Sequence, residues 1–194
     1  MNINVTTGGK RMKENEEIYR NFVKDFESVM CNLTSGRSYS NIIFLSIGTQ
    51  RLTGDAFGAL VGTRLTNLLR NARKLNVIGT LDNTVSLCNI NCVLENIRSN
   101  YTNPFIIAID AALSTTNNIG KIFVTEGGVK LGSSLNRQGI IVGDMSIRGI
   151  VGKNCRNVNQ NLRVLQNVPL SRVVNLADIV SSGIYNTINY ECDE

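Results

Sequence analysis

The sequence predicts a single-domain α/β protein, a three-layer αβα sandwich with a mainly parallel, doubly wound sheet. Short apolar runs rich in β-branched residues recur along the chain, and such runs are typical of strands buried on both faces. Amphipathic segments of helical length separate them. The chain has 194 residues and no long Pro-, Gly- or Ser-rich linker, so we expect one hydrophobic core.

The first 40 residues are expected to form a helical segment that packs on the core. Residues 13–30 have the spacing of an amphipathic helix, and the turn residues 35–38 follow. The α/β domain is expected to occupy residues 41–194. The apolar side chains of the first helix that we expect to face the core are Ile18, Phe22, Phe26, Val29 and Met30.

Strands and helices alternate through the rest of the chain, which indicates right-handed βαβ crossovers. The last two expected helices follow residue 157, and Pro169 suits the first turn of the second. The apolar runs expected to be strands cover residues 42–48, 75–79, 105–109, 121–125 and 145–151. Two helices are expected between these strands: one starts near residue 55, and the other covers residues 85–98. A loop is expected over residues 126–143.

Composition is that of a soluble globular protein, with 42% hydrophobic and 18% charged residues. No apolar run is long enough to span a membrane, and the polar start MNINVTTGGKRMKENEE has no signal-peptide core, so we expect a cytoplasmic location and no membrane partner. The net charge of +5 is dispersed along the chain, and we expect no nucleic-acid partner.

Histidine is absent from the sequence, which excludes histidine bases, serine–histidine and cysteine–histidine catalysis, and histidine-ligated metals. The five cysteines are expected to be reduced and mostly buried. Cys88 and Cys92 have the spacing of half a metal site, but no second cysteine pair completes it. We therefore expect no metal and no cofactor.

Two apolar strands are followed by a carboxylate, and these aspartates are the candidate catalytic residues. Asp55 follows the strand 42–48 after the loop TQRLTG, and Asp110 directly follows the strand 105–109. If the strands are neighbours in a doubly wound sheet, both carboxylates face the crevice at the switch point. Two close aspartates share a proton, so one can activate a water while the other acts as an acid. This is the chemistry of aspartic peptidases.

Other interpretations of these residues remain open. Asp55 has the position of a helix cap, and Asp110 could bond only to a neighbouring loop. Asp82 lies just beyond a strand but is followed by asparagine, as in turns. Asp144 precedes its strand and is expected at the opposite edge of a parallel sheet. The glycine-bracketed loop 48–54 could hold an anion, but it lacks the Gly-Lys-Ser/Thr of a Walker loop.

Four segments in order resemble the YyaC family of sporulation proteins. They are IGTQRLTGDAFG at 47–58, IGTLD at 78–82, IAIDA at 107–111 and VGDMSI at 142–147. That family is similar to the germination protease of spore-forming bacteria, an aspartic-type endopeptidase with a phosphorylase/hydrolase-like fold, and more remotely to hydrogenase maturation proteases. The resemblance places the two proposed catalytic aspartates of the germination protease on Asp55 and Asp110. Two positions depart from its pattern, Gln50 and Ala59.

The resemblance also implies which residues bind substrate. Those expected are Thr49, Thr53 and Gly54 of the first segment, Asp82 of the second, and Asn136 and Arg137 of LGSSLNR, which resembles a Pro-Gly-Ser-Gly-type loop. The implied function is a sporulation-associated, peptidase-like hydrolase acting on a protein or peptide, with spore proteins as candidate substrates. A non-catalytic binding or regulatory module on the same scaffold and a small-molecule or nucleotide hydrolase remain alternatives. The sequence predicts no oligomeric state.

Overall fold

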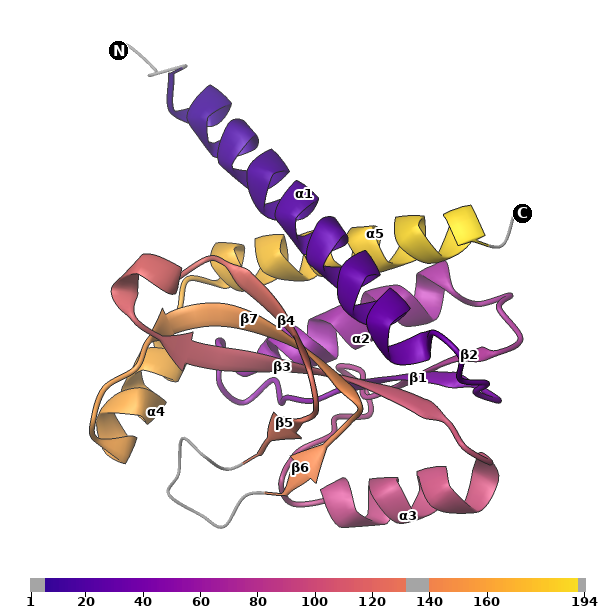
Figure 1. Cartoon of the computed structure of the whole chain (residues 1–194). Coiled ribbons are helices and arrows are strands. Elements are labelled where there is room, and N and C mark those ends of the chain that lie inside the picture. The colour runs from indigo at the N-terminus through magenta and orange to yellow at the C-terminus, as the bar shows by residue number, and fades with distance from the viewer. Residues whose placement is uncertain (1–5, 132–139, 192–194) are drawn as a thin grey trace.

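The computed structural model describes residues 6–131 and 140–191, in which a five-stranded sheet forms the middle of three layers (Figure 1). The strand order is β2-β1-β3-β7-β4. Neighbours are parallel from β2 to β7, and β4 is antiparallel to β7, so the predicted mainly parallel α/β fold is confirmed. The strand bounds are β1 Ile42–Ser46, β2 Leu75–Ile78, β3 Phe105–Ser114, β4 Ile122–Glu126 and β7 Met145–Lys153.

Helices cover both faces of this sheet. One face carries α1 (Thr6–Thr34), α2 (Ala56–Leu68) and α5 (Leu170–Glu191), and the other carries α3 (Ile90–Asn100) with a hairpin of β5 (Val129–Lys130) and β6 (Ile141–Val142). The crossovers through α2 and α3 therefore run on opposite faces, and the winding reverses at β1. The remaining helices are the 3-10 turn η1 (Thr116–Asn118) and α4 (Val158–Gln166).

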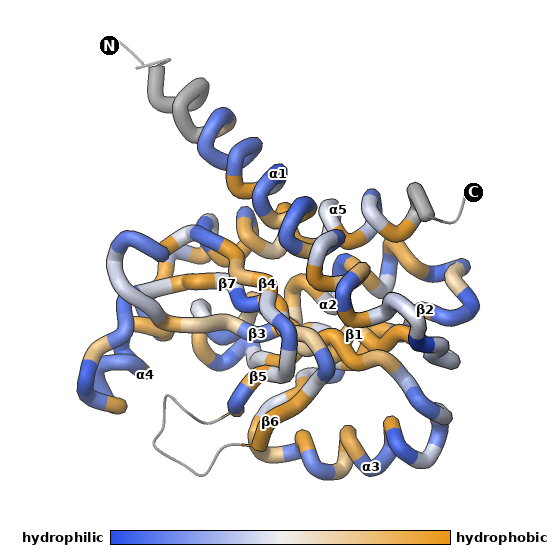
Figure 2. The backbone as a smooth tube through the Cα atoms, viewed as in Figure 1, coloured by the Kyte–Doolittle hydropathy of each residue, from blue (hydrophilic) through white to orange (hydrophobic). Residues whose placement is uncertain are grey.

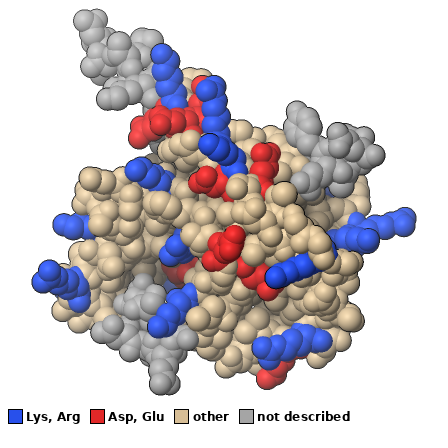
Figure 3. Space-filling view, viewed as in Figure 1, with Lys and Arg blue, Asp and Glu red and all other residues tan. Residues whose placement is uncertain are grey.

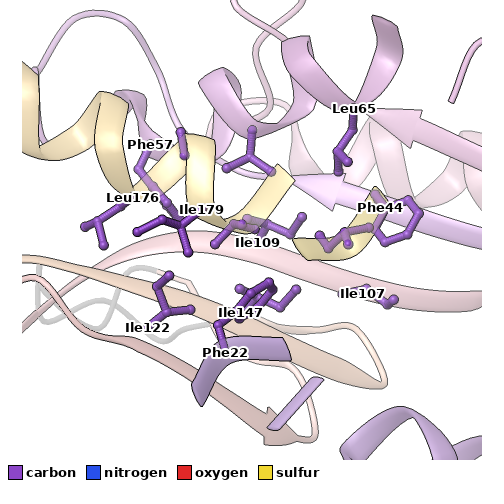
Figure 4. Packing of buried hydrophobic residues seen from close by; sticks show 14 of the residues in the cluster. Phe22, Phe44, Phe57, Leu65, Ile107, Ile109, Ile122, Ile147, Leu176 and Ile179 are labelled. Carbon is purple, nitrogen blue, oxygen red and sulfur yellow. The ribbon is translucent and has the colours of Figure 1, made fainter. Parts of the chain in front are cut away.

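Alternation along β1 divides the core into two clusters. Phe44 packs with the residues under α1, α2 and α5, whereas Ile43 and Leu45 pack with those over α3, and all three are fully buried. Figure 4 shows the first cluster, in which Phe22 of α1 lies next to Ile147 and Leu176 of α5 lies near Ile179. Figure 2 shows β1 as a continuously hydrophobic strand, as a strand buried on both faces requires.

The N-terminal helix packs on the same face and is longer than the predicted 13–30. Phe22 and Phe26 are buried in the core, and the side-chain amides of Asn15 and Asn175 donate to each other across α1 and α5 at 2.8 and 2.9 Å. The hydrophilic start of α1 projects away from the sheet (Figures 1 and 2). The spacing of apolar residues predicted only the buried part of the helix, because only that part needs an apolar face.

Three boundaries differ from the sequence-based expectation. β3 does not end at residue 109 but continues through Asp110 to Ser114, because β7 supplies parallel partners over that length. α3 begins at Ile90 rather than at 85, since Val85 bridges to the end of β1. The expected loop 126–143 contains the β5–β6 hairpin, whose two-residue strands are too short to show a hydrophobic period.

No helix within the described ranges combines the length and the apolarity that crossing a bilayer would need.

Candidate active site

A cavity of about 630 Å³ opens where β1 and β3 end their parallel pairing. Its wall comes from the loop after β1, the segment before α3, β3 and α4, so it lies at the switch point of the sheet. Asp55 and Asp110 both line it. The wall is rich in leucine, with the side chains of Leu52, Leu87, Leu113, Leu131, Leu162 and Leu165.

The loop after β1 turns sharply because of Gly48. Its φ is +147°, and a Cβ at this position would lie 2.0 Å from the carbonyl oxygen of Asp55. Only glycine tolerates both conditions. The close approach brings the first turn of α2 against the end of β1, and it holds Asp55 at the cavity wall.

Asp55 occupies the N-cap position of α2, but its side chain makes no capping hydrogen bond in the described structure. Its Oδ2 instead accepts from the backbone N–H of Thr49 at 2.8 Å and from the Thr49 hydroxyl at 3.0 Å. Burial raises the pKa of Asp55, and these two hydrogen bonds oppose the rise because they stabilise the carboxylate. The simple helix-cap interpretation is therefore wrong.

Asp110 lies inside β3, opposite Arg148 of β7 in the parallel register. Burial, followed by the nearby charge of Asp55, raises the pKa of Asp110 to about 8. A hydrogen bond from the Ala111 N–H to Oδ1 at 2.8 Å and the charge of Arg148 act in the opposite direction. At neutral pH the Asp110 side chain therefore keeps its proton.

Burial raises the pKa of both carboxyl groups, but they differ in the hydrogen bonds and charges that oppose the rise. No hydrogen bond joins Asp55 to Asp110 within the described residues, so they interact through charge and through whatever enters the cavity that both line. Asp55, with two donors from Thr49, is better suited to be the carboxylate. Such a pair can serve as base and acid for one reaction.

The four predicted substrate-binding residues that the structure describes lie in three different places. Thr49 lines the cavity. Thr53 and Gly54 do not: the Gly54 N–H donates to the Leu165 carbonyl at 2.8 Å, and the Thr53 hydroxyl lies 3.4 Å from the Gln166 carbonyl, so both pack against α4. Asp82 is exposed in a turn away from the cavity wall, as the turn interpretation expects.

The other predicted substrate-binding residues, Asn136 and Arg137, lie outside the described residues. Asp144 is at the opposite edge of the sheet, as expected, where its Oδ2 accepts from the Ile106 N–H at 2.8 Å. It is therefore no part of this site.

Residues 11–183 match the family described as "Protein of unknown function (DUF1256)". The chain belongs to the DUF1256 family. The uncharacterized protein YyaC of Bacillus subtilis (strain 168) is 31% identical over 163 residues, which cover 83% of this chain and 76% of that protein. The predicted YyaC-type family is therefore confirmed.

Among solved structures, the DUF1256 chain is similar to the NiFe hydrogenase maturation protease HycI from Thermococcus kodakarensis KOD1. The alignment has 17% identity and a TM-score of 0.48, and it covers 80% of this chain and 98% of that one. The predicted relation to the germination protease stays a prediction.

Several cavity residues of this DUF1256 protein were not predicted. Gln50 and Arg51 belong to the loop after β1, and Thr84 and Ser86 precede α3. Asn161 of α4 is 6% exposed, and its Oδ1 accepts from the Cys155 N–H at 2.7 Å. The polar residues next to Asp55 in sequence could have been included in the prediction, but Asn161 reaches the cavity only because α4 folds back over the carboxyl ends of the strands.

The cysteines of this DUF1256 protein are not mostly buried, so that expectation is wrong. Cys31, Cys88 and Cys92 are exposed and Cys155 is half-buried, whereas Cys192 lies outside the described residues. All four described cysteines are free thiols. In the described part of the chain, no group of three or more cysteine, aspartate or glutamate side chains is placed to hold a metal ion.

Proposed function

We propose that this protein hydrolyses a peptide bond, with Asp55 as the general base and Asp110 as the general acid. One observation supports the proposal most directly: two carboxyl groups line the same cavity at the switch point of the sheet, and burial raises the pKa of both, that of Asp110 to about 8. The reaction requires neither histidine, which the chain lacks, nor a cofactor.

In the proposed reaction, the Asp55 carboxylate takes a proton from a water molecule as the water oxygen attacks the carbonyl carbon. The Asp110 carboxyl group donates its proton to the carbonyl oxygen, which yields a neutral tetrahedral diol. As the C–N bond breaks, Asp55 gives its proton to the leaving amine. A diol hydroxyl returns a proton to Asp110, so both residues regain their starting forms.

The proposed substrate is a protein or peptide of a sporulating bacterial cell. This part of the proposal is supported by the four sequence segments that resemble sporulation proteins, and spore proteins are the first candidates to test. The apolar side chains of the cavity wall suit an apolar side chain of a peptide.

The test compares wild type with Asp55→Asn, Asp110→Asn and the matched control Asp82→Asn in a cleavage assay on purified small acid-soluble spore proteins. We expect each cavity substitution to lower the cleavage rate by about 10²-fold or more, the range that one acid–base group contributes. The exposed Asp82 should be replaceable without loss. Undiminished cleavage by Asp55→Asn would contradict the proposed mechanism.

A binding or regulatory module is the second candidate, favoured by the lack of a hydrogen bond between the Asp55 and Asp110 side chains described above. It predicts stable association with a sporulation protein and no turnover. Pull-down with wild type, followed by mass analysis of the recovered protein for new chain ends, separates the two: an intact bound protein favours the module.

A further inference from the structure

A second cavity of about 570 Å³ adjoins the first on the other side of Asp110. The two share Asp110, Ala111, Leu113 and Asn161 in their walls. The second cavity lies between β7, the β5–β6 hairpin and the segment before α4. Figure 3 shows a hollow in this region of the surface with Lys and Arg atoms at its edge.

Three basic residues line this cavity, and we refer to Lys130, Arg148 and Arg156 together as the basic pocket. They come from β5, β7 and the segment before α4, so residues far apart in sequence are brought to one place. Asp110 is the one acidic group among the described residues of the wall, and burial and the charge of Asp55 keep it protonated at neutral pH. The basic pocket therefore carries a net positive charge next to the proposed catalytic pair.

Arg148 adds a second observation. Its side chain is only partly exposed, and its Nε is buried without a hydrogen-bond partner among the described residues. A buried, unpaired donor of a charged group is unfavourable unless a ligand accepts from it. The planar guanidinium presents its donors in a geometry that matches a carboxylate.

The wall also contains polar side chains that offer further donors. The hydroxyls of Thr125 and Ser146 lie 2.8 Å apart, so one of them donates to the other and the second hydroxyl proton is left for a ligand. This cavity therefore differs from the leucine-lined first one and is suited to an anionic rather than an apolar group.

We propose that the basic pocket binds a carboxylate of the peptide substrate next to the bond to be cleaved. Asp110 lies between the two cavities, so a chain bound across it would place one side in the leucine-lined cavity and an acidic group in the basic pocket. The carboxylate can be an acidic side chain or the free C-terminus of the substrate. The inference rests on the proposed peptidase function but is tested by binding alone.

The experiment uses the full chain with Asp55→Asn, which keeps peptides uncleaved, at about pH 6, where Asp110 keeps its proton in the variant and a glutamate side chain is ionised. Three alanine-rich probe peptides are titrated by calorimetry. The first has blocked ends and a central glutamate, the second replaces the glutamate by glutamine, and the third ends in a free carboxylate at that position. We expect the glutamate peptide to bind about 10-fold more tightly than the glutamine peptide, as for one charge-assisted hydrogen bond.

The exposed residues Lys130 and Arg156 provide the variants, since neither is needed to fill the core. Lys130→Gln with Arg156→Gln should abolish the preference for glutamate, whereas the control pair Lys121→Gln with Arg98→Gln, on exposed residues outside both cavities, should retain it. Arg148→Gln is a further variant in which the preference should also fall. If the third peptide binds more tightly than the glutamate peptide, the pocket is assigned to the free C-terminus of a chain. If these two peptides bind equally, the pocket is assigned to carboxylates in general.

Equal affinity for glutamate and glutamine peptides, or a preference that survives loss of Lys130 and Arg156, would overturn this inference. Either result would do so whether or not the wild type cleaves. A glutamate preference that depends on Lys130 and Arg156, in a wild-type protein that cleaves nothing, would instead support the carboxylate site and contradict the peptidase function.

Discussion

At the scale of single residues, the two cavity aspartates show how surroundings set chemistry. Asp55 receives two hydrogen bonds from Thr49, which stabilise its charged form. Asp110 receives one, from the Ala111 N–H, and has the charge of Asp55 nearby. Burial raises the pKa of both side chains, and the two donors from Thr49 make Asp55 the better suited of the two to carry the charge.

Asp55→Asn should lower the pKa of Asp110, because it removes a negative charge that disfavours ionisation of its neighbour. Titration of the Asp110 carboxyl carbon by NMR in both proteins measures the change. We expect an apparent pKa near 8 in wild type and a value lower by about one unit in the variant, the size expected for a like charge nearby. Asp82→Asn serves as the control. An identical titration of Asp110 in wild type and Asp55→Asn would show that the two carboxyl groups are not coupled.

Asp110→Asn should stabilise the fold at high pH. The pKa of Asp110 rises from 3.8 to about 8 on folding, so its contribution is fully present below pH 3.8 and is lost as the pH rises through about 8. Because asparagine does not ionise, the free energy of unfolding of the variant does not fall in this way. By pH 9 we expect the variant to be more stable than wild type by about 2 kcal/mol, a value below the full linkage estimate because the cavity admits solvent.

Denaturant unfolding of wild type and Asp110→Asn between pH 4 and pH 9 measures this difference. The gap between the two free energies of unfolding should widen with pH. A constant gap would mean that Asp110 is already ionised across the range, and it would remove the acid from the proposed reaction.

At the scale of elements, the site depends on how closely α2 packs against β1 and β3. Gly58 in the first turns of α2 lies under two strand carbonyls, and a Cβ there would be 2.0 Å from the Ile47 oxygen and 2.8 Å from the Ile109 oxygen. Both contacts are with backbone, which cannot rotate away. The absence of a side chain at this position therefore allows the helix to bring Asp55 to the cavity.

Gly58→Ala should destabilise the protein, although alanine is normally the better helix residue by roughly 1 kcal/mol. The clash with two backbone carbonyls must displace α2, and we expect a loss of about 3 kcal/mol in the free energy of unfolding. The matched control is Asn67→Ala at an exposed position of the same helix, which should change stability by no more than about 0.5 kcal/mol. Thermal and denaturant unfolding test both. A Gly58→Ala protein as stable as wild type would contradict the described packing.

At the scale of the whole molecule, α1 shares its core with the α/β domain. Phe22 is 1% exposed and lies in one cluster with strand residues and α5 (Figure 4). Phe22 and Phe26 interdigitate with the other side chains of this cluster. On unfolding, the N-terminal helix and the sheet therefore lose these contacts at the same time. We therefore expect α1 to unfold with the rest of the chain and not as a separate unit.

Phe22→Ala should lower the stability of the entire protein by about 3–5 kcal/mol, because it removes a buried aromatic side chain and leaves a cavity. The unfolding transition should remain single when it is followed by circular dichroism and by tyrosine fluorescence. Met12→Ala, at a side chain that is 74% exposed, is the control and should have no effect. Two separate transitions in the Phe22→Ala protein would show that α1 is an independent unit.

Much of the fold follows from local patterns. The strands around Ile43 and Ile107 were predicted because both faces of the sheet are covered, which makes their sequences continuously apolar. The helical face with Phe22 and Phe26 was predicted because apolar residues recur there at helical spacing, as a helix with one buried face requires. The β5–β6 hairpin was not, because two-residue strands have no period to detect.

The candidate site was predictable only in part. Asp55 and Asp110 were selected because each follows an apolar run, and strand ends meet at one edge of a parallel sheet. Thr53 and Gly54 were assigned to substrate, but they pack against α4 because that helix folds back over the loop. No local pattern contains such a contact.

By itself, the sequence determined the order of the sheet strands and main helices, the apolar faces that form the core and the choice of Asp55 and Asp110 after apolar runs. These depend on the chemistry of neighbouring residues, which a linear pattern contains. Only the tertiary structure decided the protonation preference of Asp55 and Asp110 and the assembly of the basic pocket. Burial and charge act through space, and they depend on which distant segments the fold places side by side.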